Sequence, residues 1–358
     1  MRWLREIIDE IFELGALRCL AFALAAFAGA WYLEKSSYHE GLIVDTNFFS
    51  DAGDAGALLL ASTHPDANLL GVNVNYPSVT SALAVKNILG YYGELSVPVG
   101  LHPGAQNFTI LHRIQVDDGD LAARLMWGWQ RYSPRTSQNN DRVPITPSLD
   151  MYRSVLARAK RKGITIVSIG FLDDLSDLLN SPGDTYSSLL GYDLVKRKVK
   201  ELVIMGGQYP FGQESNFLYN PGAAANVVRN WPSKIVFSGS ELGRHALSGA
   251  RLTTEARFGD PVMTAYWWKN GYNRSQESCD PLTMLYAIEG PGEMFEYAGT
   301  DGLNSVFLDG INVWVEAKGD YKQAYLKLKV SNETAAARLD DLFVQGAALY
   351  AKERPNLV

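Results

Sequence analysis

The densest group of side chains capable of chemistry lies in the segment Val44–Leu58, which holds the carboxylates Asp45, Asp51 and Asp54 and the amide Asn47. Carboxylates packed this closely repel one another unless a cation or a bound polyol compensates for their charge. Alternating oxygen ligands suit a calcium-like ion, which takes about 6–8 of them. The alternative is ordinary turn chemistry, because Asp and Asn cap helices and glycine adopts positive φ. The segment alone leaves both interpretations open.

The elements around this segment place it at a ligand-binding edge. Leu42–Val44 is a short apolar run typical of a buried strand, and Ala57–Ala61 is typical of a helix. Apolar runs continue to alternate with helical segments, which indicates βαβ units and a mostly parallel α/β sheet. In such sheets, ligands bind outside the carboxyl ends of the strands. The other predicted strands are Leu69–Val74, Ile164–Ile169, Leu202–Met205 and Ile235–Phe237, and Ser81–Tyr92 is a further predicted helix.

Length and charge bound the class of protein. The 358 residues allow a large buried core, and the net charge of −6 comes without any long run of Lys or Arg. A nucleic-acid-binding surface normally carries a basic stripe, so no nucleic-acid partner is expected. We predict one domain over residues 41–350, with Gln130–Pro147 as a polar surface loop.

Residues 1–40 are predicted to be a hydrophobic targeting or anchor segment. Cys19–Leu33 is an uncharged run of 15 residues. This is shorter than the ~20 apolar residues of a full membrane span, so it suits a short span or the core of a signal peptide. A buried amphipathic helix is the alternative. The expected location is therefore membrane-anchored or in the secretory pathway.

Six segments, in order along the chain, resemble the motifs of the inosine-uridine-preferring nucleoside hydrolases. The first is Val44–Leu58, which resembles D-T-D-x-x-S-D-x-D-D-x-G-A-L. The others are Leu70–Ser78, Ile166–Leu175 (compare G-P-L-T-N-L), Val203–Gly207 (M-G-G), Glu214–Ala224 (E-F-N, then D-P-E-A-A) and Ser278–Leu282 ([HW]-D-P). The resemblance implies a Rossmann-like open α/β sheet with helices on both faces. It also implies a calcium-bound water that cleaves the N-glycosidic bond of ribonucleosides.

The resemblance also implies roles for single residues. The metal ligands would be Asn47, Asp54, the main-chain carbonyl of Asp173, and Asp280. The residues that bind the sugar would be Asn75, Glu214, Asn216 and, in place of a missing family carboxylate, Asp51.

Three departures from the family pattern bear on activity. Asn47 stands where the family has the aspartate that takes a proton from the metal-bound water; Asp51 and Asp45 are the candidate replacements. Gly53 stands where an aspartate contacts the ribose hydroxyls. Cys279 stands where some members carry a histidine that protonates the leaving group, and a thiol there is expected mainly to pack.

Two functions therefore stay open. One is a calcium-dependent N-glycosyl hydrolase, intact or impaired, and the other is a ligand-binding pseudoenzyme or a repurposed small-molecule biosynthetic enzyme on the same fold. The expected partner is a small molecule, and a homo-oligomer is compatible with the sequence. The aromatic residues that could stack on a flat ligand are Phe48, Phe49, Tyr76, Tyr209 and Phe211.

Overall fold

The computed structural model describes residues 40–104, 111, 115, 119–130, 144–319 and 321–353. The chain divides into two units, residues 1–39 and residues 40–358, and the description below concerns the second. The predicted targeting or anchor segment lies outside the described residues. Among the helices that are described, none is long and apolar enough to cross a membrane.

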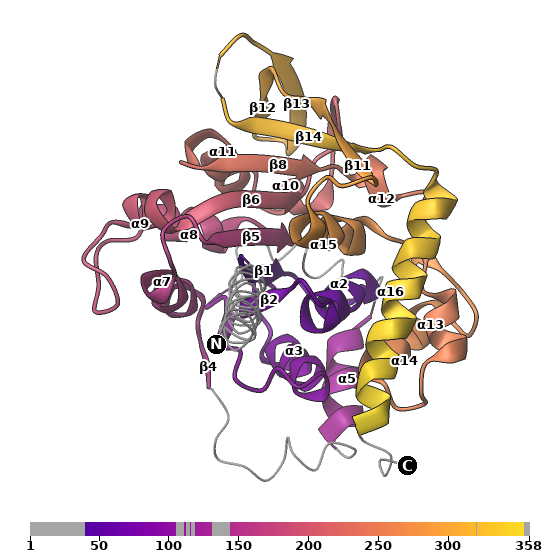
Figure 1. Ribbon diagram of the computed structural model, residues 1–358. Coiled ribbons are helices and arrows are strands. Elements are labelled where there is room, and N and C mark those ends of the chain that lie inside the picture. Colours follow the sequence, from indigo (N-terminus) through magenta and orange to yellow (C-terminus); the bar gives the residue numbers. More distant parts are fainter. Residues whose placement is uncertain are drawn as a thin grey trace, which may run out of the picture. The chain divides into compact units, whose positions relative to one another are not determined.

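A nine-stranded sheet forms the centre of the domain (Figure 1). Within the described residues, every neighbouring pair of its strands is parallel except β11 and β14. In spatial order the strands are β11 (Phe295–Gly299), β14 (Gln323–Leu328), β8 (Lys234–Ser238), β6 (Val199–Met205), β5 (Ile164–Ile169), β1 (Gly41–Thr46), β2 (Asn68–Val74), β3 (Val99–Leu101) and β4 (Ile145–Pro147).

Helices cover both faces of this sheet, and each face has its own apolar core. Alternate residues of a strand point to opposite faces, so Val44 packs into one core and its neighbour Ile43 into the other. The first core is covered by α2 (Ala52–Thr63), α3 (Val79–Tyr91), α5 (Leu121–Gln130), α14 (Pro261–Asn270), α15 (Cys279–Glu289) and α16 (Asn332–Glu353), with α13 (Ala250–Glu255) against α14 and α16. The second core is covered by α7 (Ser148–Arg158), α8 (Asp173–Asn180), α9 (Gly191–Lys198) and α11 (Pro221–Asn230).

Further short elements lie outside the nine-stranded sheet. They include two helices, α10 (Ser215–Tyr219) and α12 (Ser240–Gly243), and two small antiparallel sheets. One sheet comprises β12 (Gly302–Val306), β13 (Ile311–Glu316) and β7 (Phe211–Gln213), and the other comprises β9 (Leu247–Ser248) and β10 (Gln276–Glu277).

The predicted mostly parallel sheet with helices on both faces is confirmed, and each predicted strand and helix lies within or overlaps an observed one. Residues 131–143 lie outside the described residues, and the prediction of a loop over Gln130–Pro147 is wrong at both of its ends, because Gln130 ends α5 and Ile145–Pro147 pairs with β3 as an edge strand. Proline is tolerated there since an edge strand leaves one side unpaired.

The strand order reverses between β1 and β5. From β1 the chain proceeds through β2, β3 and β4 on one side, whereas β5, β6, β8 and β14 lie on the other. Such a reversal opens a crevice at the carboxyl ends of the two central strands. Asn47 follows β1 and Phe171 follows β5, so both lie at this crevice.

Candidate functional site

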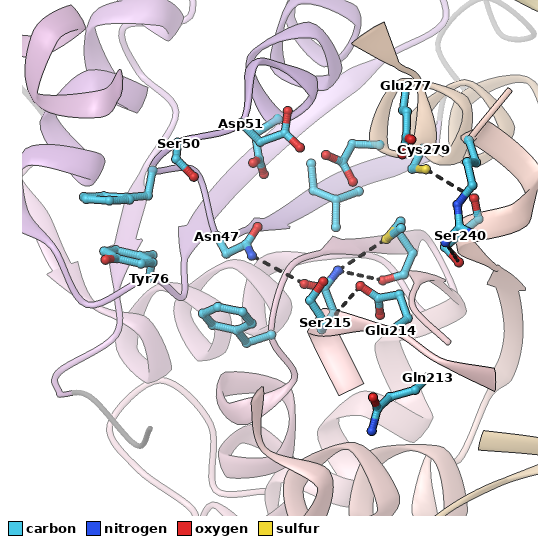
Figure 2. Close-up of a pocket in the computed structure, with 18 residues that line it drawn as sticks. Asn47, Ser50, Asp51, Tyr76, Gln213, Glu214, Ser215, Ser240, Glu277 and Cys279 are labelled. Carbon is cyan, nitrogen blue, oxygen red and sulfur yellow. Dashed lines mark hydrogen bonds between the residues drawn. The ribbon is translucent and has the colours of Figure 1, made fainter. Parts of the chain in front are cut away.

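A cavity of about 430 Å³ lies at this crevice, a size that suits a small-molecule ligand. Its walls come from separate segments that the fold brings together: the loop after β1, the turn after β5, the β7–α10 region, α12, and the start of α15 (Figure 2). The predicted site residues that line it are Asn47, Asp51, Asp54, Glu214, Asn216 and Asp280.

Three aspartates of the cavity lie at helix N-termini. Asp51 is the N-cap of α2, where its carboxylate accepts a 2.8 Å hydrogen bond from the Gly53 N–H. Asp54 lies in the first turn of α2, and Asp280 lies in the first turn of α15. The partial positive charge of a helix N-terminus favours negative charge at all three positions.

That stabilisation does not remove the repulsion between the carboxylates. Burial, followed by the charge of Asp51, raises the pKa of Asp54 well above its ordinary value, against the lowering effect of the Thr46 hydroxyl that donates to it. Burial, followed by the charge of Asp54, likewise raises the pKa of Asp280. The Asp54–Asp280 pair is therefore poised to take up either a proton or a cation.

The donor types in this part of the cavity fit a hard cation. Carboxylate oxygens of Asp54 and Asp280 and the amide oxygen of Asn47 all line the same cavity, and oxygen ligands are those that calcium prefers. Within the described ranges, however, no group of three or more His, Cys, Asp or Glu side chains is arranged to hold a metal ion. A calcium ion there would need main-chain, ligand or water oxygens to complete its coordination.

Asn47, Glu214 and Asn216 form the polar wall next to these carboxylates. The Asn47 Nδ2 donates to Asn216 Oδ1 at 3.4 Å, and the Asn216 Nδ2 donates to the Met205 carbonyl at 3.1 Å (Figure 2). Glu214 is the N-cap of α10 and accepts hydrogen bonds from the N–H groups of Asn216, at 2.8 Å, and Gly207, at 3.1 Å. Burial raises the pKa of Glu214 in spite of these bonds.

Asp45 lies outside the cavity lining, on the opposite face of the sheet. It is fully buried and accepts hydrogen bonds from Tyr152 Oη and from the side-chain amide of Asn75. Its strand neighbour Thr46 faces the cavity side and bonds to Asp54, as the alternation of a strand requires. Asp45 is thus a structural carboxylate rather than a candidate proton acceptor.

Asn75, a predicted sugar ligand, also has a structural position. It is 1% exposed, and both ends of its amide pair with the main chain of Phe171. Its Nδ2 donates to the Phe171 carbonyl at 2.9 Å, and its Oδ1 accepts from the Phe171 N–H at 3.2 Å. Asn75 therefore fixes the turn after β5 instead of presenting a free amide to a ligand.

Asp173 does not line the cavity either. Its carboxylate accepts a 2.6 Å hydrogen bond from Asn220 Nδ2, and Ile169 and Phe171 are the residues of this segment that face the cavity. Its main-chain carbonyl stays a predicted metal ligand.

Gly53 is closely surrounded by polar atoms. A Cβ atom at this position would lie 2.9 Å from Asp280 Oδ2 and 3.3 Å from both Asp51 Oδ1 and Gln276 Nε2. Gln276 Nε2 also donates to Asp51 Oδ1 at 2.8 Å, so the space of the missing family carboxylate is crossed by a hydrogen bond. Gly53 therefore leaves room for the hydrogen bond between Gln276 and Asp51 at the rim of the cavity.

Aromatic rings form one end of the cavity. Phe49 and Tyr76 line it and stack on each other, with ring centroids 4.1 Å apart, and Phe171 lines it while stacking on Tyr219 at 3.7 Å. Of the other predicted stacking residues, Phe48 and Tyr209 are buried outside the lining and Phe211 is 68% exposed. Phe171 was missed because it occupies the proline position of the G-P-L motif.

Cys279 lies at the other end, next to Ser240 (Figure 2). Its Sγ is 3.5 Å from the Ser240 carbonyl, and burial together with the charge of Asp280 raises the pKa of the thiol. Cys279 therefore stays protonated at neutral pH and is a weak acid for a leaving group.

Comparisons with known proteins identify the family and the fold. The family model for inosine-uridine preferring nucleoside hydrolases matches residues 42–341. A search of curated proteins found no match.

Solved structures show the same fold at low sequence identity. A plant nucleoside hydrolase, PpNRh1, is 18% identical with a TM-score of 0.60, and the match covers 86% of this chain and 99% of that one. The inosine-uridine preferring nucleoside hydrolase of Bacillus anthracis is 16% identical with a TM-score of 0.63, over 86% and 99% of the two chains. The type III effector protein XopQ, solved with adenosine diphosphate ribose, is 17% identical with a TM-score of 0.58, over 86% and 92%. By its sequence match, its fold and the position of its cavity, the chain belongs to the inosine-uridine preferring nucleoside hydrolase family.

Proposed function

We propose that the cavity binds a ribosyl N-glycoside together with calcium and hydrolyses the N-glycosidic bond at a reduced rate. The observation that carries the proposal is the convergence of Asp54, Asp280, Glu214 and Asn216 on one cavity at the strand-order reversal of a family fold. These residues come from three distant parts of the chain and match the family in type at family positions.

Different side chains of the cavity bind different parts of the ligand in this proposal. The rings of Phe49, Tyr76 and Phe171 offer flat apolar surfaces to a base. Glu214 and Asn216 offer hydrogen-bonding groups to sugar hydroxyls from the polar wall.

Calcium would be held by Asp54, Asp280, the Asn47 amide oxygen and the main-chain carbonyl of Asp173. When bound, it would supply positive charge that lowers the pKa of a coordinated water and orients the sugar.

Asp51 is the proton acceptor in this proposal. It lines the cavity, and the hydrogen bonds that it accepts from Gly53 and Gln276 both fall on Oδ1. Its carboxylate is held as a helix cap, and an amide at position 47 cannot take a proton in its place. The capping role of the Asp51 carboxylate and the amide at position 47 both favour slow turnover.

The same two features support a second candidate, a protein of this fold that binds the ligand without hydrolysing it. The two candidates differ in one measurable respect, because only the first consumes the nucleoside.

The test uses purified full-length protein with inosine or uridine, with calcium or with chelator. We expect calcium to raise the melting temperature, since a ligand that binds only the native state stabilises it. We also expect ribose release that is abolished by chelator and by Asp54→Asn. Calcium stabilisation without ribose release would favour the binding protein. A melting curve that calcium leaves unchanged in wild type, with no ribose released, would overturn the proposal.

A further inference from the structure

The loop that joins α14 to β10 carries a sequence motif that the proposed function does not use. Asn273-Arg274-Ser275 is an Asn-x-Ser tripeptide, the acceptor sequence for an N-linked glycan. The two ends of the loop are held together, because Asn270 Nδ2 donates to Gln276 Oε1 at 2.8 Å. Asn273 lies between these ends and is exposed, so a bulky group attached to it would meet solvent.

The backbone at Asn273 is fixed in a turn. Its N–H donates to Thr253 Oγ1 at 2.9 Å, and its φ of 53° is left-handed, a conformation that asparagine tolerates better than most residues do. Gly271, at the start of the loop, also has a positive φ of 94°. The loop therefore holds the asparagine on the surface in a defined conformation.

An exposed aromatic cluster of Phe258, Trp267 and Tyr272 lies beside this asparagine. The ring centroid of Trp267 is 6.2 Å from that of Phe258 and 6.3 Å from that of Tyr272. Phe258 is 78% exposed, Trp267 38% and Tyr272 61%. Exposed apolar groups that cluster in this way usually mark a surface that binds something. Because Tyr272 directly precedes Asn273, a sugar attached to Asn273 would start next to this surface.

We propose that Asn273 is N-glycosylated and that the first sugar of the glycan packs on the aromatic cluster. The C–H face of a sugar ring is apolar and carries partial positive charge, which suits the negative face of an aromatic ring. In the transfer, Asn273 Nδ2 loses a proton and bonds to the anomeric carbon of a lipid-linked oligosaccharide, and the lipid pyrophosphate leaves. The reaction takes place in the secretory pathway, to which the apolar run Cys19–Leu33 would direct the chain.

A second tripeptide, Asn332-Glu333-Thr334, has less suitable surroundings. Asn332 is half-buried as the first residue of α16 and lines a surface cavity formed by α12 and β14. The hydroxyl of Thr334 is 3.2 Å from that of Ser331. Asn332 therefore leaves less room for a glycan than Asn273 does. A third tripeptide, Asn107-Phe108-Thr109, lies outside the described residues.

The first test asks whether Asn273 carries a glycan in the full-length chain produced in a eukaryotic host. Intact mass before and after peptide N-glycosidase, followed by peptide mapping, locates the modification. We expect a glycan at Asn273 that Ser275→Ala removes and Ser275→Thr retains, because the hydroxyl is the required part of the motif. Asn332→Gln should leave the glycan at Asn273 in place. An unmodified Asn273, whether the chain enters the secretory pathway or stays in the cytosol, would overturn the proposal.

The second test asks whether the glycan stabilises the native state. Glycosylated wild type should melt at least about 1 °C above Ser275→Ala from the same host. Ser275→Ala is used because it leaves the left-handed Asn273 unchanged, whereas a substitution of Asn273 itself would add backbone strain. The same two proteins produced in bacteria, where neither carries the glycan, should melt at the same temperature. Equal melting temperatures of the two proteins from the eukaryotic host would overturn the proposed packing.

The last measurement identifies the surface on which the sugar packs. Trimming the glycan to its first sugar should preserve the difference in melting temperature. Replacing Trp267 and Tyr272 together by serine should remove the difference, whereas replacing Tyr186 and Tyr192, which are exposed elsewhere on the domain, should not. A difference that persists without Trp267 and Tyr272 would overturn the packing of the sugar on the aromatic cluster.

Discussion

The substitution Asn47→Asp tests how much activity the cavity has lost. The Asn47 Nδ2 bond to Asn216 Oδ1 is 3.4 Å long, so replacing it costs only the lower end of an ordinary hydrogen bond, about 0.5 kcal/mol. The new carboxylate would join Asp54 and Asp280, whose pKa values are already raised, and so the variant should be less stable than wild type in chelator. Calcium should therefore raise the melting temperature of Asn47→Asp by more than that of the wild type.

The expected gain in rate is larger than the cost in stability. A positioned general base supplies about 10²–10⁴ in rate, which corresponds to about 3–5 kcal/mol of barrier. Part of this is already provided by Asp51 in the proposed mechanism, so we expect a gain of at least about ten-fold in kcat for inosine and uridine, measured by release of reducing sugar.

Gln213→Glu is the matched control, since it makes the same amide-to-carboxylate change in the cavity lining at a residue with no predicted role in proton transfer or sugar binding. A folded, calcium-responsive Asn47→Asp protein that is no faster than wild type would refute the reasoning. Equal acceleration by the two variants would refute it as well, because charge alone would then explain the gain.

Two further predictions concern stability. Gly53→Ala should lower the unfolding free energy by about 1 kcal/mol or more and weaken calcium stabilisation, since its Cβ would lie 2.9 Å from Asp280 Oδ2. Gly222→Ala, also at the second residue of a helix but with its nearest neighbour at 3.5 Å, should not, and equal melting shifts for the two would contradict the steric argument. Burial raises the pKa of Asp260 to about 6, so the native state holds this proton more tightly than the unfolded state, and stability should fall as pH rises from about 4 to about 6. Asp260→Asn should match wild type near pH 4 and exceed it by at most about 3 kcal/mol above pH 7, measured by urea unfolding; wild-type and variant profiles that stay parallel would show that Asp260 is not the group responsible.

Apolar runs predicted the strands and the motif segments predicted the cavity carboxylates, because both depend on local sequence. Asp54 and Asp280 begin helices whose N-termini meet at the strand-order reversal, and the fold follows from the alternation of apolar runs with helices. The faces of the strands were harder to predict. Asp45 and Thr46 point to opposite sides of β1, and a strand buried on both faces carries no polar alternation to show which side holds the cavity.

Long-range pairing accounts for the rest of what the sequence did not show. The family resemblance predicts Asn75 as a sugar ligand, and the sequence does not show that its partner, the Phe171 main chain, lies 96 positions away. Arg244 belongs to no motif, and only the packing of α12 against α15 brings it to the cavity. The small sheet of β7, β12 and β13 likewise joins segments about a hundred residues apart.

The hydrogen bonds between Asn75 and Phe171 make the Phe171 backbone N–H a probe of whether this edge of the sheet is assembled. Asn75 directly follows β2 and Phe171 lies just beyond β5, and these strands are neighbours of β1 on opposite sides. The Phe171 N–H is shielded by this side chain, so its hydrogen exchanges with solvent only when the three strand ends separate. Its exchange rate therefore measures how firmly the cavity's scaffold is closed, independently of whether any ligand is turned over.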